Sequence, residues 1–214
     1  MKIILFDIDG VLIRLPHFFS IELEKHGFKN AEESLNSFFT GKDNHQCLEG
    51  KANAEDLILP YLQKFGWQKT AIEYLKQQFQ FEKQFLDKDL ISIVQKLQKQ
   101  GIKCCLSTDQ EKNRAQFLLN DMNFKNIFDK HFISCYVGYR KCHDEFWSYT
   151  IKELKKEFGK INPNEIVFFD DKQNNIDIAL KSGIQAFLFT DVTQFKKDLI
   201  KILSEGRFDS IYTK

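Results

Sequence analysis

Short apolar runs recur along the chain, and each has the length of a buried β-strand. The first, residues 3–7 (IILFD), is continuously apolar and rich in β-branched residues, a pattern typical of a strand covered on both faces. Similar runs follow at 102–107 (IKCCLS), 132–137 (FISCYV), 166–170 (IVFFD) and 185–189 (QAFLF). The pattern therefore predicts five strands that are buried within a sheet.

Between most of these runs, apolar residues recur at helical spacing. Residues 89–100 show this spacing and are followed by Gly101, a residue that commonly terminates helices. Further helices are predicted around 115–122, at 176–180 with Gly183 as the stop, and at about 193–204. Strands that alternate with helices form parallel βαβ units. The predicted fold class is α/β, a doubly wound parallel sheet with a Rossmann-like core.

One stretch, from about residue 15 to residue 85, breaks the alternation because it carries helix signals and no strand pattern. Asn30 and Asn53 are candidate N-caps, and Pro60 is expected to kink or split the helix that contains it. The helices predicted in this stretch cover 18–26, 31–40, 54–65 and 69–85. We expect an α/β core domain formed by 1–14 and 87–214, with an all-α domain at 15–86 inserted after the first strand.

The composition argues against several classes of partner. The 214 residues are 43% hydrophobic and 14% aromatic, which is enough to build a core, so disorder is not expected. Thirty-one basic residues balance thirty acidic ones, whereas a general nucleic-acid binder usually has a basic excess. No apolar run approaches the roughly 18 residues of a membrane span. We expect neither nucleic acid nor a membrane as a partner.

The cysteines and the first residues bear on where the protein works. The five cysteines are odd in number and form no CxxC pair, so neither a zinc site nor a disulfide framework is indicated. The chain passes from Met-Lys directly into a short apolar run without a small-residue cleavage site, so we do not expect a signal peptide. A cytoplasmic location fits both observations. The sequence does not indicate an oligomeric state.

Polar residues gather where the predicted strands end. Ligands of open parallel sheets bind at the carboxyl ends of the strands, so these residues are candidates for one site. Each group alone is a weak signal, because an acid close to another acid is common in loops. Together they place four acids, a hydroxyl and a cation on one edge of one sheet. The candidates are Asp7, Asp9, Ser107, Thr108, Lys141, Asp170 and Asp171.

Four segments that carry these residues resemble, in order, the four motifs of the haloacid dehalogenase superfamily, in its phosphatase branch. They are "ILFDIDGVL", "CCLSTD", "VGYRK" and "IVFFDDKQNN", and the text "FKNIFDKHFIS" before "VGYRK" is also typical of a common subfamily. The resemblance covers about 1–14 and 87–190. It implies a Rossmann-like core, and the inserted helical domain resembles that subfamily's cap domain in position and character, although not by any motif.

The resemblance implies a role for each acid. Asp7 would be the nucleophile that forms an aspartyl-phosphate, which divides hydrolysis into two easier steps. Mg²⁺ would be the cofactor, held by the carboxylates of Asp7 and Asp171 and by the backbone carbonyl of Asp9. Asp170 would bind the metal through a water molecule or support its ligands. Asp9 would protonate the leaving oxygen and then take a proton from the attacking water.

The remaining candidates would bind the phosphoryl group. Ser107 would donate a hydrogen bond to it, Thr108 would contribute to substrate binding, and Lys141 would neutralise charge on the nucleophile and on the transferring group. Asn175 would have a supporting role. Two positions depart from the pattern: Cys142 stands where proline usually follows the lysine, and Thr108 stands where asparagine often follows the serine. Neither departure removes a reacting group, although the loop that carries Lys141 could be placed differently.

The acid at position 9 favours one activity within the superfamily. Dehalogenases lack an acid there, because halide leaves without a proton, so Asp9 favours phosphoryl transfer. The predicted function is Mg²⁺-dependent hydrolysis of a small soluble phosphate monoester, by a phosphoric monoester hydrolase that works through an aspartyl-phosphate. Two alternatives stay open: a phosphomutase that isomerises a sugar phosphate, and a non-catalytic binding or regulatory protein on the same fold.

Polar residues of the inserted domain are candidates for selecting the substrate, because a cap over the site contacts the leaving group. For most of them, an ordinary solvated loop position is the simpler interpretation. The sequence does not identify the ester. These residues are Arg14, His17, Lys42, Asp43, Asn44, His45 and Lys51.

Overall fold

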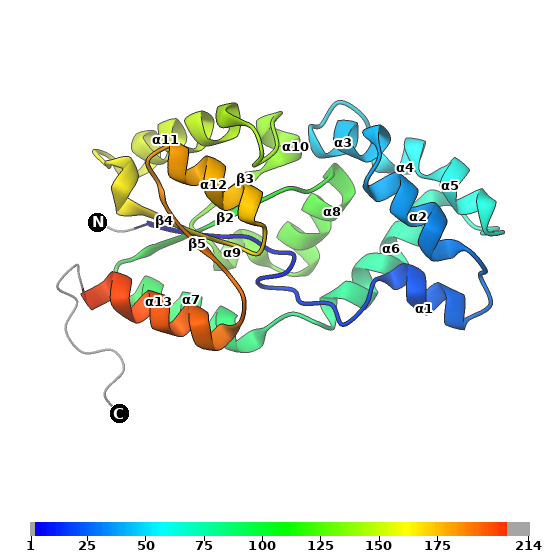
Figure 1. Cartoon of the computed structure of the whole chain (residues 1–214), viewed down its shortest axis with the longest axis horizontal. Coiled ribbons are helices and arrows are strands. Elements are labelled where there is room, and N and C mark those ends of the chain that lie inside the picture. Colours follow the sequence, from blue (N-terminus) through cyan, green and yellow to red (C-terminus); the bar gives the residue numbers. More distant parts are fainter. Residues whose placement is uncertain (1–2, 205–214) are drawn as a thin grey trace.

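The computed structural model describes residues 3–204, and at its centre lies a five-stranded sheet whose strands all run parallel (Figure 1). The strand order is β3-β2-β1-β4-β5, so the first strand of the chain lies in the middle. The predicted α/β class with a doubly wound parallel sheet is confirmed. The strands are β1 (Ile3–Phe6), β2 (Lys103–Thr108), β3 (Lys130–Ile133), β4 (Ile166–Asp170) and β5 (Gln185–Leu188).

Helices cover both faces of the sheet. Successive side chains of a strand point to opposite faces, so continuously apolar strands present apolar side chains on both faces for helices to cover. Ile4 and Phe6 belong to one apolar cluster, and Ile3 and Leu5 belong to another on the opposite face. The first cluster includes residues of α7 (Lys88–Lys99) and α13 (Val192–Ser204). The second includes residues of α11 (Asp144–Phe158) and α12 (Gln173–Lys181). The sheet is therefore buried on both sides, as its continuously apolar strands predicted.

The connection from β2 to β3 is helical throughout. It consists of α8 (Lys112–Gln116), a π-helical turn η1 (Phe117–Asp121) and α9 (Phe124–Ile127). The side chain of Glu111 caps α8 by accepting a hydrogen bond from the backbone N–H of Asn113 at 2.8 Å. Residues on β2 and at the start of α8 therefore lie at the carboxyl edge of the sheet.

The strand predicted at 132–137 is wrong in its second half. The strand β3 ends at Ile133, and residues 134–137 form the helical turn α10 (Ser134–Val137). Ile133 pairs with Thr108, the last residue of β2, so the residues beyond it have no neighbouring strand to bond with. The backbone turns into a helix, and the N–H of Gly138 donates to the carbonyl of Ser134 at 2.8 Å. The helix α11 and the short 3₁₀ turn η2 (Pro163–Glu165) then lead to β4.

Residues 15–86 contain six helices, and we call this stretch the cap. Pro60 stands in the first turn of α5, so the helix predicted at 54–65 is split as expected. Helix α6 begins with a capping box, in which Thr70 and Glu73 bond each other's backbone N–H groups. The cap helices are α1 (Phe19–Lys25), α2 (Ala31–Phe39), α3 (Lys42–Leu48), α4 (Ala54–Leu57), α5 (Leu59–Lys64) and α6 (Ala71–Lys83).

Three local expectations for the cap are wrong. Asn30 does not cap α2 with its side chain, because its backbone is left-handed with a φ of 64° and it makes no capping hydrogen bond. Asn53 stands at the N-cap position of α4, but its amide donates to Asp56 at 3.0 Å instead of accepting from the backbone. The polar residues expected in a loop around 42–45 lie on α3, a helix that the apolar pattern did not predict.

The chain crosses between core and cap twice, and the two crossings lie side by side. Ile13 and Leu86 form an antiparallel bridge, and the N–H of Asp87 donates to the carbonyl of Leu12 at 2.8 Å. Arg14 forms an ion pair with Asp87 across the same point. The division of the chain into 1–14 with 87–214 and 15–86 stays a prediction, and residues 1–2 and 205–214 lie outside the described part.

Two features of the described chain bear on location. All five cysteines are free thiols, and four of them are buried. Among residues 3–204, every helix is too short or too polar to span a bilayer.

Candidate active site

The register of the central strands places three polar residues in one row. Phe6 of β1 pairs with Leu106 of β2 on one side and with Phe169 of β4 on the other. One residue further, Asp7, Ser107 and Asp170 therefore face the same edge of the sheet. The N–H of Asp7 donates to the carbonyl of Phe169 at 3.0 Å, which extends the ladder by one bond. Backbone pairing between the strands brings these side chains together.

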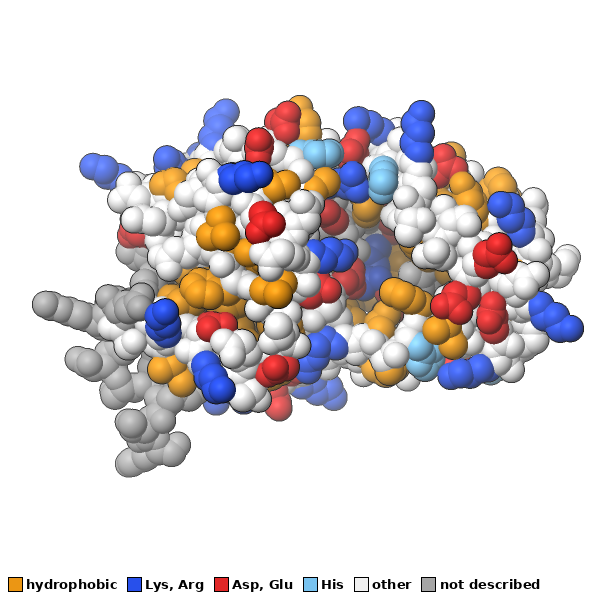
Figure 2. All heavy atoms as spheres, viewed as in Figure 1, with side chains coloured by type: hydrophobic (Ala, Val, Ile, Leu, Met, Phe, Trp, Pro, Cys, Tyr) orange, Lys and Arg blue, Asp and Glu red, His pale blue; other side chains and the backbone are white. Residues whose placement is uncertain are grey.

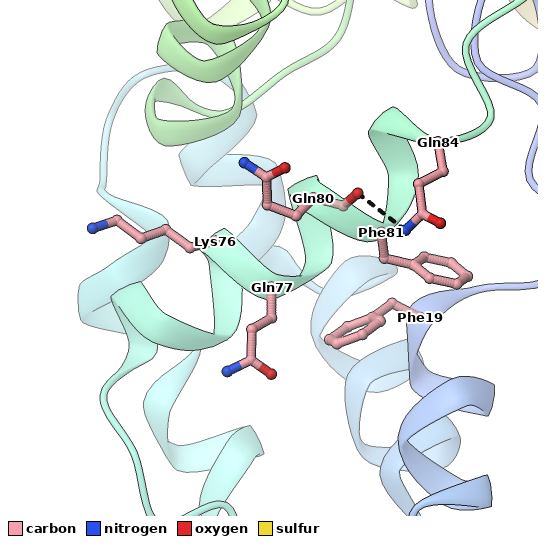
Figure 3. Close-up of a pocket in the computed structure, with 6 residues that line it drawn as sticks. All are labelled: Phe19, Lys76, Gln77, Gln80, Phe81 and Gln84. Atoms are coloured by element: carbon pink, nitrogen blue, oxygen red, sulfur yellow. Dashed lines mark hydrogen bonds between the residues drawn. The ribbon is translucent and has the colours of Figure 1, made fainter.

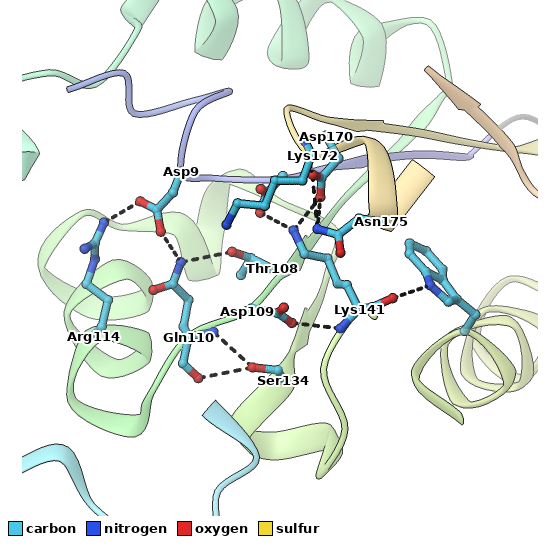
Figure 4. A network of polar contacts seen from close by, with 12 residues as sticks. Asp9, Thr108, Asp109, Gln110, Arg114, Ser134, Lys141, Asp170, Lys172 and Asn175 are labelled. Carbon is cyan, nitrogen blue, oxygen red and sulfur yellow. Dashed lines mark hydrogen bonds and ion pairs between the residues drawn. The ribbon is translucent and has the colours of Figure 1, made fainter. Parts of the chain in front are cut away.

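Lys141 lies between two of the carboxylates (Figure 4). Its Nζ is 2.7 Å from Oδ1 of Asp7 and 2.6 Å from Oδ2 of Asp170, and the side chain is 3% exposed. The backbone N–H of Lys141 donates to Asp109 at 2.9 Å, and its carbonyl accepts from the indole of Trp147 at 2.9 Å. These two bonds hold the loop that carries Lys141 in place.

Every oxygen of Asp170 is occupied by protein donors. Oδ1 accepts from the N–H of Lys172 at 2.7 Å, Oδ2 accepts from Lys141, and the amide of Asn175 donates to both. A carboxylate bonded in this way has little capacity left for a metal ion. These bonds suit Asp170 to orient Lys141, and the supporting role of Asn175 stays a prediction.

The residues at the edge of the sheet fit a divalent cation. Carboxylate oxygens of Asp7, Asp170 and Asp171 lie within 4.8 Å of one another. Oδ1 of Asp7 is buried and makes no hydrogen bond with a described residue, although Lys141 is close to it. Three carboxylates face a single buried ammonium, so the cluster lacks positive charge. Hard oxygen ligands with uncompensated negative charge are what Mg²⁺ prefers.

Gly10 is required by the position of Asp171. A Cβ on Gly10 would lie 2.2 Å from Oδ2 of Asp171, and the φ of Gly10 is +82°, a conformation that favours glycine. The N–H of Gly10 donates to the carbonyl of Ile13 at 2.8 Å, so the chain turns sharply after Asp9. The turn lets the carboxylate of Asp171 approach the backbone of the first loop.

The electrostatics reflect the shortage of positive charge. Burial raises the pKa of Asp7 to about 8, and Asp170 adds to the rise while Lys141 opposes it. Burial likewise raises the pKa of Asp171, again with a contribution from Asp170. For Lys141, burial alone would lower the pKa, but attraction to Asp7 and Asp170 raises it above its ordinary value. The lysine is therefore a permanent cation in the cluster.

Asp9 has a different environment from Asp7. Its Oδ2 accepts from the amide of Gln110 at 2.7 Å, and its Oδ1 pairs with the guanidinium of Arg114 at 2.9 Å (Figure 4). The side chain is 45% exposed. Burial alone would raise the pKa of Asp9, but Arg114 and Gln110 hold it below its usual value. Sequence reasoning missed both partners, whose only signal was their place at the start of the helix after β2.

The two hydroxyls at the end of β2 differ in their partners. Both Ser107 and Thr108 are fully buried. The hydroxyl of Thr108 accepts a hydrogen bond from Gln110 at 3.0 Å. The hydroxyl of Ser107, by contrast, makes no hydrogen bond with any residue in 3–204. An unpaired buried hydroxyl beside Asp7 can bind an oxygen of a ligand.

Residues 1–183 match the family described as haloacid dehalogenase-like hydrolase. The chain belongs to this family. Among curated proteins, bifunctional epoxide hydrolase 2 of Rattus norvegicus is 25% identical over 121 residues, which are 55% of this chain and 21% of the relative. The match thus spans about a fifth of the relative's length.

Solved structures show that this haloacid dehalogenase-like hydrolase shares its fold with enzymes that bind different ligands. A HAD family enzyme from Bacteroides thetaiotaomicron, in complex with magnesium and inorganic phosphate, aligns with a TM-score of 0.68 and 21% identity over 91% of this chain and 98% of that one. L-2-haloacid dehalogenase from Xanthobacter autotrophicus, with chloropropionic acid covalently bound, aligns with a TM-score of 0.63 and 14% identity over 98% and 85%. The fold alone does not choose between these activities.

Most polar cap residues predicted near the mouth of this hydrolase's site have other partners. Arg14 forms an ion pair with Asp87 where the chain crosses between core and cap. His17 pairs with Glu22 at 3.1 Å on the cap. Lys51 bonds Glu49 at 2.6 Å, and Glu49 lies 3.6 Å from Arg140 of the core. The rest lie on α3, where Asp43 accepts from Tyr61 and Asn44 donates to Phe39, while Lys42 is exposed and His45 is half-buried.

The cap rests on the core beside the carboxylate cluster, and charged side chains gather in the hollow between the two halves (Figure 2). Asn113 donates to Glu55 at 2.6 Å, and Lys112 donates to Asn53 at 3.3 Å. A Cβ on Gly50 would lie 2.2 Å from the carbonyl of Cys135, so the cap loop touches α10 directly. The cleft therefore has polar walls on both sides.

A second hollow lies on the cap itself (Figure 3). Its walls are the rings of Phe19 and Phe81 and the side chains of Lys76, Gln77, Gln80 and Gln84. No carboxylate lines it, so it cannot supply the metal-binding chemistry of the sheet edge. The candidate active site is the cleft at the carboxyl ends of β1, β2 and β4.

Proposed function

We propose that the chain is a Mg²⁺-dependent phosphohydrolase that cleaves a small phosphate monoester through an aspartyl-phosphate on Asp7. The observation that carries this proposal is the carboxylate of Asp9, held on both oxygens beside Asp7 at the mouth of the cleft. A halide leaves without a proton, whereas an alcohol needs one. The magnesium and phosphate bound by the Bacteroides enzyme support the same substrate class.

In the first step, an oxygen of Asp7 attacks phosphorus and the bond from phosphorus to the ester oxygen breaks. Asp9 donates a proton to the departing oxygen. Lys141 neutralises charge on Asp7 and on the phosphoryl oxygens, and the free hydroxyl of Ser107 donates to one of them. Asp7, Asp171 and the carbonyl of Asp9 would hold Mg²⁺, which would supply positive charge to keep the nucleophile ionised and to bind the phosphate.

In the second step, a water molecule attacks the phosphorus of the aspartyl-phosphate, and Asp9 accepts the proton from that water. The bond between phosphorus and Asp7 breaks, which releases inorganic phosphate. The lowered pKa of Asp9 suits this step, because the base must be ionised. The negative charge of a phosphate dianion bound beside Asp9 opposes the charge of Arg114 and raises the pKa of Asp9. The bound phosphate therefore favours the protonated form of Asp9 that the first step needs.

The cleft favours a small polar ester. Carboxylates, amides and cations of core and cap, including Glu55, Asn53 and Lys112, meet where the two parts touch. A long apolar leaving group would cover these polar side chains without offering them hydrogen-bond partners, which is unfavourable. The cap thus suits a soluble metabolite and leaves the specific ester open.

Hydrolysis of p-nitrophenyl phosphate with and without Mg²⁺ tests the proposal. We expect metal-dependent release of nitrophenolate that disappears in Asp7→Asn, because an amide cannot form the phosphoenzyme. A purified Asp7→Asn protein as active as wild type would remove the nucleophile assignment. Isomerisation of a sugar 1-phosphate without phosphate release would instead identify a mutase. Inertness across a broad panel of esters in Mg²⁺ would indicate a non-catalytic protein.

A further inference from the structure

One buried cation of the cleft, Arg114, enters the steps above only through its effect on the pKa of Asp9. Arg114, on α8, has a side chain that is 8% exposed, and it forms two ion pairs. One joins its guanidinium to Oδ1 of Asp9 at 2.9 Å, and the other joins it to Glu82 of the cap helix α6. Glu82 is 6% exposed on its side chain. Arg114 therefore connects the proposed proton donor to the cap through one partly buried and one buried contact.

The surroundings hold Arg114 in one position. Its backbone N–H donates to the capping carboxylate of Glu111, and its guanidinium lies 5.5 Å from the centre of the Phe79 ring of α6. The amide of Gln78, also on α6, donates to Glu82 at 2.8 Å. A planar guanidinium presents several N–H groups in a fixed fork, so it can bond two carboxylates at once. A lysine could not reproduce this arrangement.

We propose that Arg114 is a positioning residue, which fixes the carboxylate of Asp9 toward the leaving group and ties that orientation to the cap through Glu82. The inference rests on the proposed phosphohydrolase function. Gln110 holds the other oxygen of Asp9 from the preceding turn, so both oxygens are fixed by one short segment of α8 and the loop before it. Without Arg114, only the amide of Gln110 restrains the half-exposed carboxylate, which can then turn toward water.

This role predicts a dependence on the leaving group. When benzyl phosphate is cleaved, the departing alkoxide oxygen takes the proton of Asp9 as its bond to phosphorus breaks. When p-nitrophenyl phosphate is cleaved, the phenolate leaves without a proton. The value of kcat/KM reports the steps through departure of the leaving group. A misplaced Asp9 therefore lowers kcat/KM for benzyl phosphate and spares it for p-nitrophenyl phosphate.

The test compares the two substrates in wild type, Arg114→Gln and Asp9→Asn, all with saturating Mg²⁺. In Arg114→Gln we expect kcat/KM for benzyl phosphate to fall about tenfold or more, and that for p-nitrophenyl phosphate to stay within about threefold. Asp9→Asn is expected to show the same selectivity more strongly. In Asp9→Asn, kcat for p-nitrophenyl phosphate is expected to fall without a matching fall in kcat/KM. Asp9 is also needed for attack by water, so phosphoenzyme accumulates.

Two further variants guard against a purely structural effect. Arg114→Gln leaves Glu82 buried without its cation, so the double variant Arg114→Gln/Glu82→Gln removes both charges and keeps hydrogen-bonding groups. It is expected to retain the selectivity between substrates. Arg140→Gln is the matched control, because Arg140 is also a core cation paired with a cap carboxylate, Glu49 at 3.6 Å, whereas the carboxylate of Asp9 is bonded by Gln110 and Arg114. Arg140→Gln is expected to change kcat/KM for both substrates by the same factor.

Equal losses on both substrates in the double variant, with wild type active, would overturn the positioning role and leave the proposed function intact. Selectivity in Arg140→Gln as large as in Arg114→Gln would also overturn it. Wild-type protein inert toward both esters would instead remove the proposed function, and the role of Arg114 with it.

Discussion

The carboxyl edge of the sheet and the cap face each other across the cleft, but different interactions hold their polar groups. At the sheet edge, backbone pairing sets the position of Asp7 and Asp170, and Lys141 between them is held by bonds to both sides of its backbone. On the cap, a cation such as Lys51 is exposed and bonds a neighbour two residues away. The sheet edge is rigid by construction, whereas the cap face depends on how the cap docks.

This difference separates chemistry from selection. Strand register fixes reacting groups to the precision that bond making requires, and it does so whatever the cap does. The cap touches the core through side chains such as Glu55 and through the loop at Gly50. Contacts of this kind can change without disturbing the sheet, so they are suited to choosing the leaving group.

The largest contrast is expected between lysines of the two regions. Lys141→Met leaves Asp7 and Asp170 buried without their cation, so turnover of p-nitrophenyl phosphate should fall about 10²–10³-fold. Lys51→Met removes an exposed ion pair, which contributes under about 1 kcal/mol, so turnover should stay within about threefold. Steady-state assays in Mg²⁺ compare them. Equal losses would show that the cap contributes to the chemistry.

Glycines with the same backbone conformation give a second contrast. In Gly10→Ala the new methyl meets the carboxylate of Asp171, so Mg²⁺ affinity measured by calorimetry should fall about tenfold or more. In the cap, Gly66 also has a φ of +82° but no atom within 4 Å of the added Cβ. Gly66→Ala should cost about 1 kcal/mol of stability and leave Mg²⁺ binding unchanged. Weakened Mg²⁺ binding in Gly66→Ala would contradict the contrast.

The same division explains what could be predicted from the sequence. Asp7, Ser107 and Asp170 each end an apolar run, and parallel strands end at one edge, so their proximity follows from local pattern and simple topology. The end of β3 could not be read in this way, because it depends on where its neighbour β2 stops, at Thr108.

The partners of Asp9 could be identified only from the folded structure. Arg114 lies in an ordinary helical segment, and nothing local marks it as a partner of a residue 105 positions earlier. Its contact to Glu82 depends on the docking of the cap, which no periodicity encodes. The cap helix α3 was missed for a related reason. Its seven residues are mostly polar, and its burial comes from tertiary contacts that involve Asn44 and Cys47.

The loop of the cap that touches the core gives a smaller expected effect. In Gly50→Ala the added Cβ would meet the backbone carbonyl of Cys135, so the loop must lift from α10. We expect KM for p-nitrophenyl phosphate to rise about fivefold, equivalent to about 1 kcal/mol of binding, with kcat less affected. Gly66→Ala serves as control, since both positions have a positive φ but only Gly50 faces the core. An unchanged KM in Gly50→Ala would show that this contact does not set the cleft.

Stability against acid gives the smallest contrast, between acids that lie outside the site. Burial alone would raise the pKa of Asp129 in the core, but hydrogen bonds from Gln98, Lys103 and the N–H of Cys104 hold it below its usual value. The ionised carboxylate therefore stabilises the fold above its unfolded pKa of about 4, and this contribution is lost as the pH falls through the lower folded value.

Asp129→Asn should reduce the free energy of unfolding in urea by about 1–3 kcal/mol at pH 7, because three donors lose a charged acceptor. The difference from wild type should shrink as the pH falls below about 4, where the wild-type carboxylate itself takes up a proton. In the cap, Glu73 is an exposed capping residue whose pKa is lowered by its bonds to Thr70. Its variant Glu73→Gln should show a weaker dependence on pH, because solvent screens the charge that it loses. A stronger dependence for Glu73→Gln than for Asp129→Asn would mean that the cap, rather than the sheet, limits acid stability.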